Sequence, residues 1–457
     1  MDVAFTLAEN VVRVGYDDLT PLAIDMTKKD ILDVLGVATA GSAALGVAEV
    51  AGLFKDWGGK KESTIIGFDC MVPSISAALV NGMMSHALDY DDGHDTSMVH
   101  AAASVVSAAF AVAQRQGRVN GKDFITAAAL GIDLMSRMAL GAKTNLRVSG
   151  WVYSSIFGYF GAAAAAGKIL GLDKEKMVNA FGITYSQTAG SFQSIADAVL
   201  TKRAQLGFAA RAGAFSALLA EKGITGPQNC MEGEYGIYNN YIKGEYDPAA
   251  VISDLGKRFE VEGMGFKAYP SCGYTHGPIF STLTLMRENR IKPDDIDEIN
   301  VSTGKNAGDL FEPSERKRRP QVVPDAQFSI PYTVGVAVIK GNVGIGDFTP
   351  DAIKDPRVLE IAQKVNPVIL AELTRREVDP SIVEIKTKDG NRYSKRMDKR
   401  IGTPENPMTP EEFADKFRDC LAHGRKQISK QKTEKVMKLV NDLEEIDDVG
   451  KIIRLLG

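Results

Sequence analysis

The sequence contains few of the residues that build metal centres and disulfide frameworks. It has 4 cysteines in 457 residues, at Cys70, Cys230, Cys272 and Cys420, and none of them forms a Cys-x-x-Cys pair for a zinc ribbon or an iron–sulfur cluster. Cysteines so sparse fit a reducing compartment, and we expect a cytoplasmic protein. No Gly-x-Gly-x-x-Gly motif follows a predicted strand, and no Walker-type loop is present. The sequence therefore predicts chemistry without a cofactor or a metal ion.

The chain also lacks a charge excess and a long apolar run. Its 54 basic and 58 acidic residues give a formal net charge of −4, which provides no field to attract nucleic acid or a membrane surface. The N-terminus shows no basic stretch followed by an apolar run. The longest runs of small apolar residues, 101–113 and 161–167, are short for a bilayer. We expect a soluble protein whose partner is a small molecule.

Histidine is scarce as well, yet three of the five histidines fall in one window, His86 to His100. Four carboxylates, those of Asp89, Asp91, Asp92 and Asp95, stand between them. Groups that exchange protons near neutral pH are typical of general acid–base catalysis. The spacing of the histidines matches no helical zinc motif, although a metal site assembled across a loop stays open, as does a polar connection with structural histidines.

The hydrophobic pattern places this window between two helices. Residues 73–90 and 101–116 are each predicted to be helical, so the aspartates would crowd the C-terminal end of the first helix, where the macrodipole disfavours negative charge. His100 would begin the second helix, whose free backbone N–H groups are suited to hold an anion. Acidic residues at a helix C-terminus conflict with local preference, and such conflicts are typical of functional sites.

The length of the chain predicts two domains. Residues 7–223 have helical periodicity nearly throughout, whereas 296–303 is predicted to be a strand and 383–395 a hairpin that turns at Asp389-Gly390. Helical segments are expected at 328–340 and 351–365, and a helix begins at Thr409-Pro410. The fold class is therefore mainly α, with an all-helical domain from 1–266 and 403–457 and an inserted α+β lid from 267–402.

A second group of reactive side chains lies where the chain enters the predicted lid. Lys267, Cys272 and His276 occur within ten residues of one another, at a domain boundary where a cleft is expected. Each also has a structural interpretation: a solvated lysine, a small buried thiol and a histidine near a helix start. Taken together, they favour a functional role.

Six segments in order resemble the MmgE/PrpD family, whose members include 2-methylcitrate dehydratase, cis-aconitate decarboxylase and iminodisuccinate epimerase. The matching segments are 86–92, 160–173, 201–210, 267–272, 327–332 and 406–413. The resemblance covers essentially the whole chain. It implies a helical domain built from both ends of the chain, an inserted lid, a homodimer and no metal or organic cofactor.

Carried over by resemblance, the family's catalytic aspartate is Asp89, its loop histidine is His100, and its two lysines are Lys202 and Lys267. Three positions depart from the family pattern. Gly93 replaces a threonine or similar polar residue, and Val152 and Cys272 stand where some dehydratase and decarboxylase members carry histidine. The thiol is similar to that of the epimerase branch.

These residues suit proton transfer at a carbon next to a carboxylate. His100 would act as base or acid with Asp89 orienting it, and Lys202 and Lys267 would stabilise the developing charge. Cys272 or His276 would act from the opposite face. The leading hypothesis is a lyase of the hydratase or dehydratase type on a small di- or tricarboxylate. An epimerase, a decarboxylase and a non-catalytic ligand-binding paralogue are the alternatives.

Two further residues are candidates for substrate binding. Asp92 belongs to the histidine-rich window, and Arg319 ends the densest run of positive charge, residues 315–319. A solvated loop is the ordinary interpretation of such a run. The functional interpretation is that the guanidinium group of Arg319 binds a substrate carboxylate through two parallel N–H···O hydrogen bonds.

Overall fold

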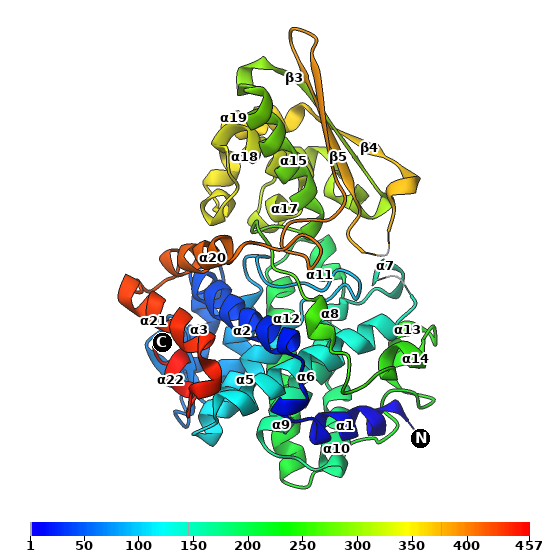
Figure 1. Cartoon of the computed structure of the whole chain (residues 1–457), viewed down its shortest axis with the longest axis vertical. Helices are drawn as coiled ribbons and strands as arrows, with labels where there is room; N and C mark the ends of the chain where they lie inside the picture. Colours follow the sequence, from blue (N-terminus) through cyan, green and yellow to red (C-terminus); the bar gives the residue numbers. More distant parts are fainter. Residues whose placement is uncertain (1, 145, 376) are drawn as a thin grey trace. The chain divides into compact units, whose positions relative to one another are not determined.

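In a computed structural model that describes residues 2–144, 146–375 and 377–457, the chain is mostly helical, with a small amount of sheet. It divides into two compact units, residues 1–264 with 411–457 and residues 265–410. The divisions fall at 264/265 and 410/411, whereas the sequence analysis placed them at 266/267 and 402/403. Both ends of the chain therefore contribute to the larger unit (Figure 1).

Helices dominate the larger unit. Their bounds are α1 Val3–Arg13, α2 Pro21–Gly41, α3 Val47–Trp57, α4 Ser74–Ser85, α5 Ala102–Gln116, α6 Gly121–Gly141, α7 Leu146–Ser149, α8 Tyr153–Ile156, α9 Gly158–Ile169, α10 Lys174–Tyr185, α11 Gln193–Ala196, α12 Thr201–Glu221, α13 Ile237–Ile242, α14 Pro248–Ile252, α20 Pro410–Ala422, α21 Lys430–Asn441 and α22 Gly450–Ile453. The unit is not purely helical, which corrects the prediction. Strands β1 (Ser63–Ile65) and β2 (Cys70–Val72) form an antiparallel pair.

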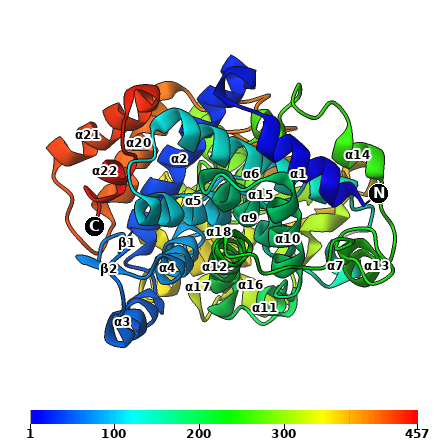
Figure 2. The same ribbon diagram turned by 90° about the horizontal axis from the view of Figure 1, so that it is seen from below.

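The centre of the larger unit is the Ala-rich helix α9. It is buried from Gly158 to Gly167 and packs against α5, α6, α10 and α12, which surround it in Figure 2. A Cβ atom at Gly161 would lie 2.7 Å from the carbonyl oxygen of Gly131 on α6, so glycine is required for the helices to approach this closely. Small residues thus set the helix spacing in this core.

One close contact bears directly on the placement of reactive side chains. Helices α4 and α12 approach at Gly82 and Gly207, where a Cβ on Gly207 would lie 2.3 Å from the carbonyl oxygen of Leu79. The carboxyl end of α4 leads into the histidine-rich loop, and α12 begins at Thr201, next to Lys202. Packing of the two helices therefore brings the start of α12 beside that loop.

Among the described residues, α6 alone is long and apolar enough to cross a membrane by length and composition. In the structure, 94% of its most apolar window is buried inside the protein, as expected of a core helix. The C-terminal helices also belong to the larger unit, where α21 packs against α2 and α22 against α5.

The smaller unit contains a four-stranded sheet in the order β4-β3-β5-β6. Its strands are β3 Ile296–Thr303, β4 Val365–Ile369, β5 Ser381–Thr387 and β6 Arg392–Met397, and its helices are α15 Gly273–Asn289, α16 Ser314–Arg318, α17 Val323–Gln327, α18 Ile330–Lys340 and α19 Pro356–Gln363. β3 pairs parallel with β4 and antiparallel with β5. Alternate residues of β5 are buried, and this face packs with α15 and α18 around one hydrophobic core (Figure 1).

Several predicted elements are confirmed in the smaller unit, and others are corrected. The strand at 296–303 and the hairpin at Asp389-Gly390 are present, and Gly390 has a φ of +90°, which glycine tolerates at that turn. The helix predicted at 351–365 is shorter: residues 352–354 form a separate 3-10 turn, α19 spans Pro356–Gln363, and residues 365–369 pair with β3 as β4. Residues 314–318 form the short helix α16 rather than a solvated loop.

Candidate active site

The loop between α4 and α5 carries a cluster of titratable side chains. Helix α4 ends at Ser85, five residues earlier than predicted, and the backbone then turns to a left-handed conformation at Asp89, with φ +52°. Aspartate is among the few non-glycine residues that adopt this conformation readily. The prediction that Asp89, Asp91 and Asp92 crowd a helix C-terminus is therefore wrong, because the chain has left the helix before it reaches them.

Asp92 caps the next helix instead. Its carboxylate oxygen Oδ2 accepts hydrogen bonds from the backbone N–H groups of Ala101 (2.9 Å) and Ala102 (3.0 Å) at the start of α5. The hydrogen-bond acceptor at this helix end is thus the protein's own side chain, which corrects the expectation that these N–H groups hold a ligand. Because Asp92 is fully buried and engaged in this way, we reassign it from substrate binding to helix capping.

The surroundings of Asp92 oppose its ionisation. Burial raises the pKa of Asp92 to about 8, and the nearby carboxylate of Asp91 acts in the same direction, whereas the N–H bond from Ala102 acts against it. The side chain therefore carries a proton for much of the time at neutral pH.

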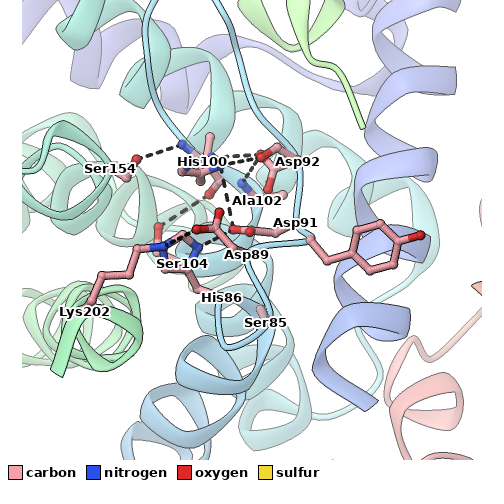
Figure 3. Close-up of polar contacts among 12 residues, drawn as sticks. Ser85, His86, Asp89, Asp91, Asp92, His100, Ala102, Ser104, Ser154 and Lys202 are labelled. Atoms are coloured by element: carbon pink, nitrogen blue, oxygen red, sulfur yellow. Dashed lines mark hydrogen bonds and ion pairs between the residues drawn. The ribbon is translucent and has the colours of Figure 1, made fainter. Parts of the chain in front are cut away.

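His100 is held on two sides. Its ring atom Nδ1 donates to the backbone carbonyl of Asp92 at 2.5 Å, and its backbone N–H donates to the Ser154 hydroxyl at 2.9 Å (Figure 3). Since a carbonyl only accepts hydrogen bonds, Nδ1 carries the proton and the lone pair of the neutral ring is at Nε2. The side chain is 29% exposed. This tautomer suits a base that acts through Nε2.

A second imidazole lies behind the first. His86 Nδ1 is 2.7 Å from Asp91 Oδ2, and both side chains are buried. The rings of His86 and His100 are 5.1 Å apart, and the same Asp91 oxygen is 4.0 Å from His100 Nδ1. Burial lowers the pKa of His86, although Asp91 opposes this effect. The selection of site residues from sequence left out His86 and Asp91, although both lie in the histidine-rich window.

Lys202 reaches this group from α12. Its Nζ is 3.0 Å from Oδ2 of Asp89, which is almost completely covered, whereas the lysine side chain is 16% exposed (Figure 3). The sequence analysis expected Asp89 to orient His100. That role stays a prediction; among the described contacts, Asp89 pairs with Lys202, and His100 bonds to Asp92 and Ser154. Ser154, on α8, was not recognised from sequence because nothing local marks it.

His94, the third histidine of the window, has different partners. Its Nδ1 accepts from the backbone N–H of Ser97 at 3.2 Å, and its Nε2 faces Glu260 at 3.6 Å. The part of the chain that the structure describes contains no group of three or more His, Cys, Asp or Glu side chains arranged to hold a metal ion.

The remaining predicted residues lie in the smaller unit. Lys267 is buried, and Cys272 is half-buried at the N-cap of α15. His276 is completely buried in the first turns of that helix, where its Nε2 is 3.2 Å from the carbonyl of Ser271. The structure thus places Cys272 and His276 on one helix and Lys267 shortly before it.

Arg319 has a more exposed environment than predicted for a substrate-gripping residue. Its side chain is 58% exposed and its Nε is 3.7 Å from Glu315. The buried basic residue of this run is Lys317, whose pKa is lowered by burial, with the Asp325 carboxylate opposing, and which lies near enough to Cys272 for the two to interact electrostatically. Lys317 and Arg319 carry the same charge and differ in burial, so the sequence alone could not distinguish them.

Two protein-family models match the chain in turn, and the second runs past residue 410 into the C-terminal helices of the larger unit. The MmgE/PrpD N-terminal domain matches residues 6–249, and the MmgE/PrpD C-terminal domain matches residues 269–443. The chain belongs to the MmgE/PrpD family. These two matches cover most of its length.

Curated relatives of this MmgE/PrpD protein resemble it from end to end. Cis-aconitate decarboxylase from Aspergillus terreus is 27% identical, over 97% of this chain and 94% of its own length. Human cis-aconitate decarboxylase is also 27% identical, over 99% and 94%. A cis-aconitate decarboxylase-like protein, oryM, from Aspergillus oryzae is 25% identical, over 100% and 97%. Identities at this level support a shared family and leave the substrate to be established.

One departure from the MmgE/PrpD pattern lies close to the candidate base. Val152, which the sequence analysis set by resemblance against a histidine of some members, immediately precedes α8, which provides Ser154. Val152 donates its backbone N–H to the carbonyl of Gly190 at 2.9 Å. The side chain at this position is not titratable, and its backbone supports the helix that holds His100.

Proposed function

We propose that this MmgE/PrpD protein is a lyase that acts, without a cofactor, on a small di- or tricarboxylate by proton transfer at a carbon next to a carboxylate. One observation carries the proposal. Within the titratable cluster, the accessible side chains are those of His100 and Lys202, whereas Asp89, Asp91 and His86 are covered. A base and a cation thus reach solvent, and the carboxylates that would repel an anionic substrate do not.

Each accessible group has a defined task in this proposal. Lys202, held by Asp89, binds a substrate carboxylate and stabilises the negative charge that develops on it. Nε2 of His100 takes the proton from the neighbouring carbon. In a dehydration the electron pair of that C–H bond forms the carbon–carbon double bond. The leaving hydroxyl group takes a proton from a second acid, the role expected from sequence for Cys272 or His276, and departs as water.

Decarboxylation is the second lyase outcome, and the names of the relatives favour it. In that reaction the bond to the departing CO₂ breaks, and the electron pair left on carbon takes a proton from the imidazolium form of His100. Both outcomes need the same cation and the same imidazole. They differ in which bond to the carbon breaks.

Epimerisation is an alternative from another reaction class, and the thiol of Cys272 at the start of α15 favours it. An epimerase removes a proton from one face of a carbon and returns one to the other, so it needs two acid–base groups. The roles of Lys267, Cys272 and His276 stay predictions of the sequence. So does the homodimer, which light scattering of the purified protein will test.

Proton NMR in deuterated water tests the proposal. The purified protein is incubated with cis-aconitate, citrate and a panel of other di- and tricarboxylates. We expect an alkene or a decarboxylated product from at least one of them. Deuterium next to a carboxylate with an unchanged skeleton would identify an epimerase. Binding without turnover or exchange would reveal a non-catalytic ligand-binding protein.

A chelator tests the absence of a metal from the chemistry. Turnover should persist in EDTA, because proton transfer by His100 and charge stabilisation by Lys202 require no metal ion. Loss of activity in EDTA that zinc or iron restores would contradict the proposed mechanism.

A further inference from the structure

A lysine from the C-terminal part of the chain, Lys416, is buried in the interior of the larger unit. Lys416, on α20, is 3% exposed at its side chain. Its Nζ lies 2.6 Å from Oδ1 of Asp33 on α2, donates to the backbone carbonyl of Tyr90 at 2.8 Å, and sits 4.3 Å from the centre of the Tyr90 ring. The ammonium group therefore joins α2, α20 and the histidine-rich loop.

Such a buried cation is retained only where it is well compensated. Taking an ammonium group out of water is costly, and a carboxylate, a carbonyl and an aromatic face each offset part of that cost. Asp30, one turn before Asp33 on α2, is also completely buried. Burial raises its pKa, and the positive charge of Lys416 opposes that rise. Lys416 is thus the counter-charge of a buried acidic group.

Tyr90 lies between two residues of the titratable cluster, Asp89 and Asp91. Asp89, before it, pairs with Lys202, and Asp91, after it, holds His86. The backbone at Asp89 is left-handed, a conformation that few residues other than glycine, asparagine and aspartate adopt, so the geometry of this segment is specific. A fixed carbonyl at Tyr90 constrains the two neighbours that carry the candidate chemistry.

We propose that Lys416 is a positioning residue, through which helix α20 holds the 89–91 segment in its reactive geometry. The inference rests on the proposed function for its kinetic readout. Lys416 acts through the Tyr90 carbonyl, so its loss should reduce kcat much more than it changes KM. Tyr90 and Lys416 are separated by 326 positions in the sequence, so no local signal indicates the contact.

The test compares Asp33→Asn with the double variant Asp33→Asn/Lys416→Met. The two differ only at position 416. In Asp33→Asn the ammonium group of Lys416 loses one carboxylate but keeps the Tyr90 carbonyl, the Tyr90 ring and its interaction with the buried acid Asp30. In the double variant Asp33 is not left as an unpaired buried charge. We expect Asp33→Asn to keep kcat within about threefold of wild type. The double variant should lose about 10² in kcat, because small misplacements of catalytic groups have effects of that size, with KM within about threefold.

Lys28→Met is the matched control. Lys28 also joins α2 to the C-terminal part of the chain, through Glu444 at 2.9 Å, and its described contacts do not involve residues 86–100. It should therefore leave kcat unchanged. If the double variant does not fold, Lys416→Gln in the same background replaces it, because the shorter amide falls short of the position of Nζ. Wild-type kcat in a folded variant that lacks Lys416 would overturn the proposal.

A second readout does not depend on turnover. Hydrogen exchange of the backbone amides in residues 86–100 should be about tenfold faster in the double variant than in Asp33→Asn, and unchanged in Lys28→Met. Equal exchange in the first two variants would refute the positioning role. If the double variant exchanges faster but the wild-type protein turns over no carboxylate, the proposed function is refuted, while Lys416 still holds the 89–91 segment in place.

Discussion

His100 and Asp92 are joined by a hydrogen bond in which the ring Nδ1 donates to the backbone carbonyl at 2.5 Å. The carboxylate of the same aspartate caps α5, which starts two residues after His100. One residue therefore fixes both the tautomer of the imidazole, through its backbone, and the helix that follows, through its side chain. Substitution of the Asp92 side chain separates these two roles.

Asp92→Asn should make stability less dependent on pH. The amide oxygen still accepts from the N–H groups of α5, and the group no longer ionises. A carboxyl whose pKa is raised to about 8 in the folded state, from 3.8, stabilises the fold below pH 4 and loses that contribution as pH rises towards 8. Between pH 5 and pH 8.5, the free energy of unfolding measured in urea should fall more for the wild-type protein than for Asp92→Asn. The opposite trend would mean that Asp92 is ionised in the folded protein.

His100→Asn should reduce turnover by about 10² to 10⁴, the usual size of a general acid–base contribution. The fold should persist, because the ring is partly exposed and its backbone contact with Ser154 is unaffected. His423→Gln, at an exposed histidine near the end of α20, is the control and should keep full activity. Initial rates with the best substrate measure both variants. Near-normal turnover in His100→Asn would remove His100 from the mechanism.

Lys202→Met should weaken substrate binding and slow turnover together, because the ammonium group serves both the bound carboxylate and the charge that develops on it. It should also lower stability by about 1–3 kcal/mol, since the covered carboxylate of Asp89 loses its ion pair with Lys202. Lys222→Met, at the exposed end of α12, is the control. Steady-state kinetics and urea unfolding give the two readouts. A change in stability alone would make the ion pair purely structural.

Cys272 should be the first cysteine alkylated by iodoacetamide. Burial raises the pKa of each of the other three thiols, and Cys230 and Cys420 are also inaccessible. Peptide mass spectrometry after brief alkylation identifies the modified residue. Faster labelling of Cys70, the other half-buried cysteine, would contradict the prediction.

If Cys272 carries a proton during turnover, Cys272→Ser should fold normally and lose about 10² in rate. Cys70→Ser is the matched control, because that thiol is also half-buried and lies on β2. Normal turnover in Cys272→Ser would leave Cys272 as the N-terminal residue of α15 and nothing more.

Short-range signals in the sequence determined much of the fold. The alternation of apolar residues defines β3 at 296–303, the Asp389-Gly390 pair defines the β5–β6 turn, and Pro410 begins α20, all as predicted. Such features depend on backbone preferences and on periodicity within a few residues, so they can be read from the chain directly. The histidine-rich window was located for the same reason.

Only the tertiary structure decided which groups in that window act together. Asp89 meets Lys202 across 113 positions, and Tyr90 meets Lys416 across 326. Strand β4 pairs with β3 in parallel, and the loop that follows α4 is held by distant partners. The free energy of these contacts comes from burial and charge pairing between remote segments, which no local pattern records.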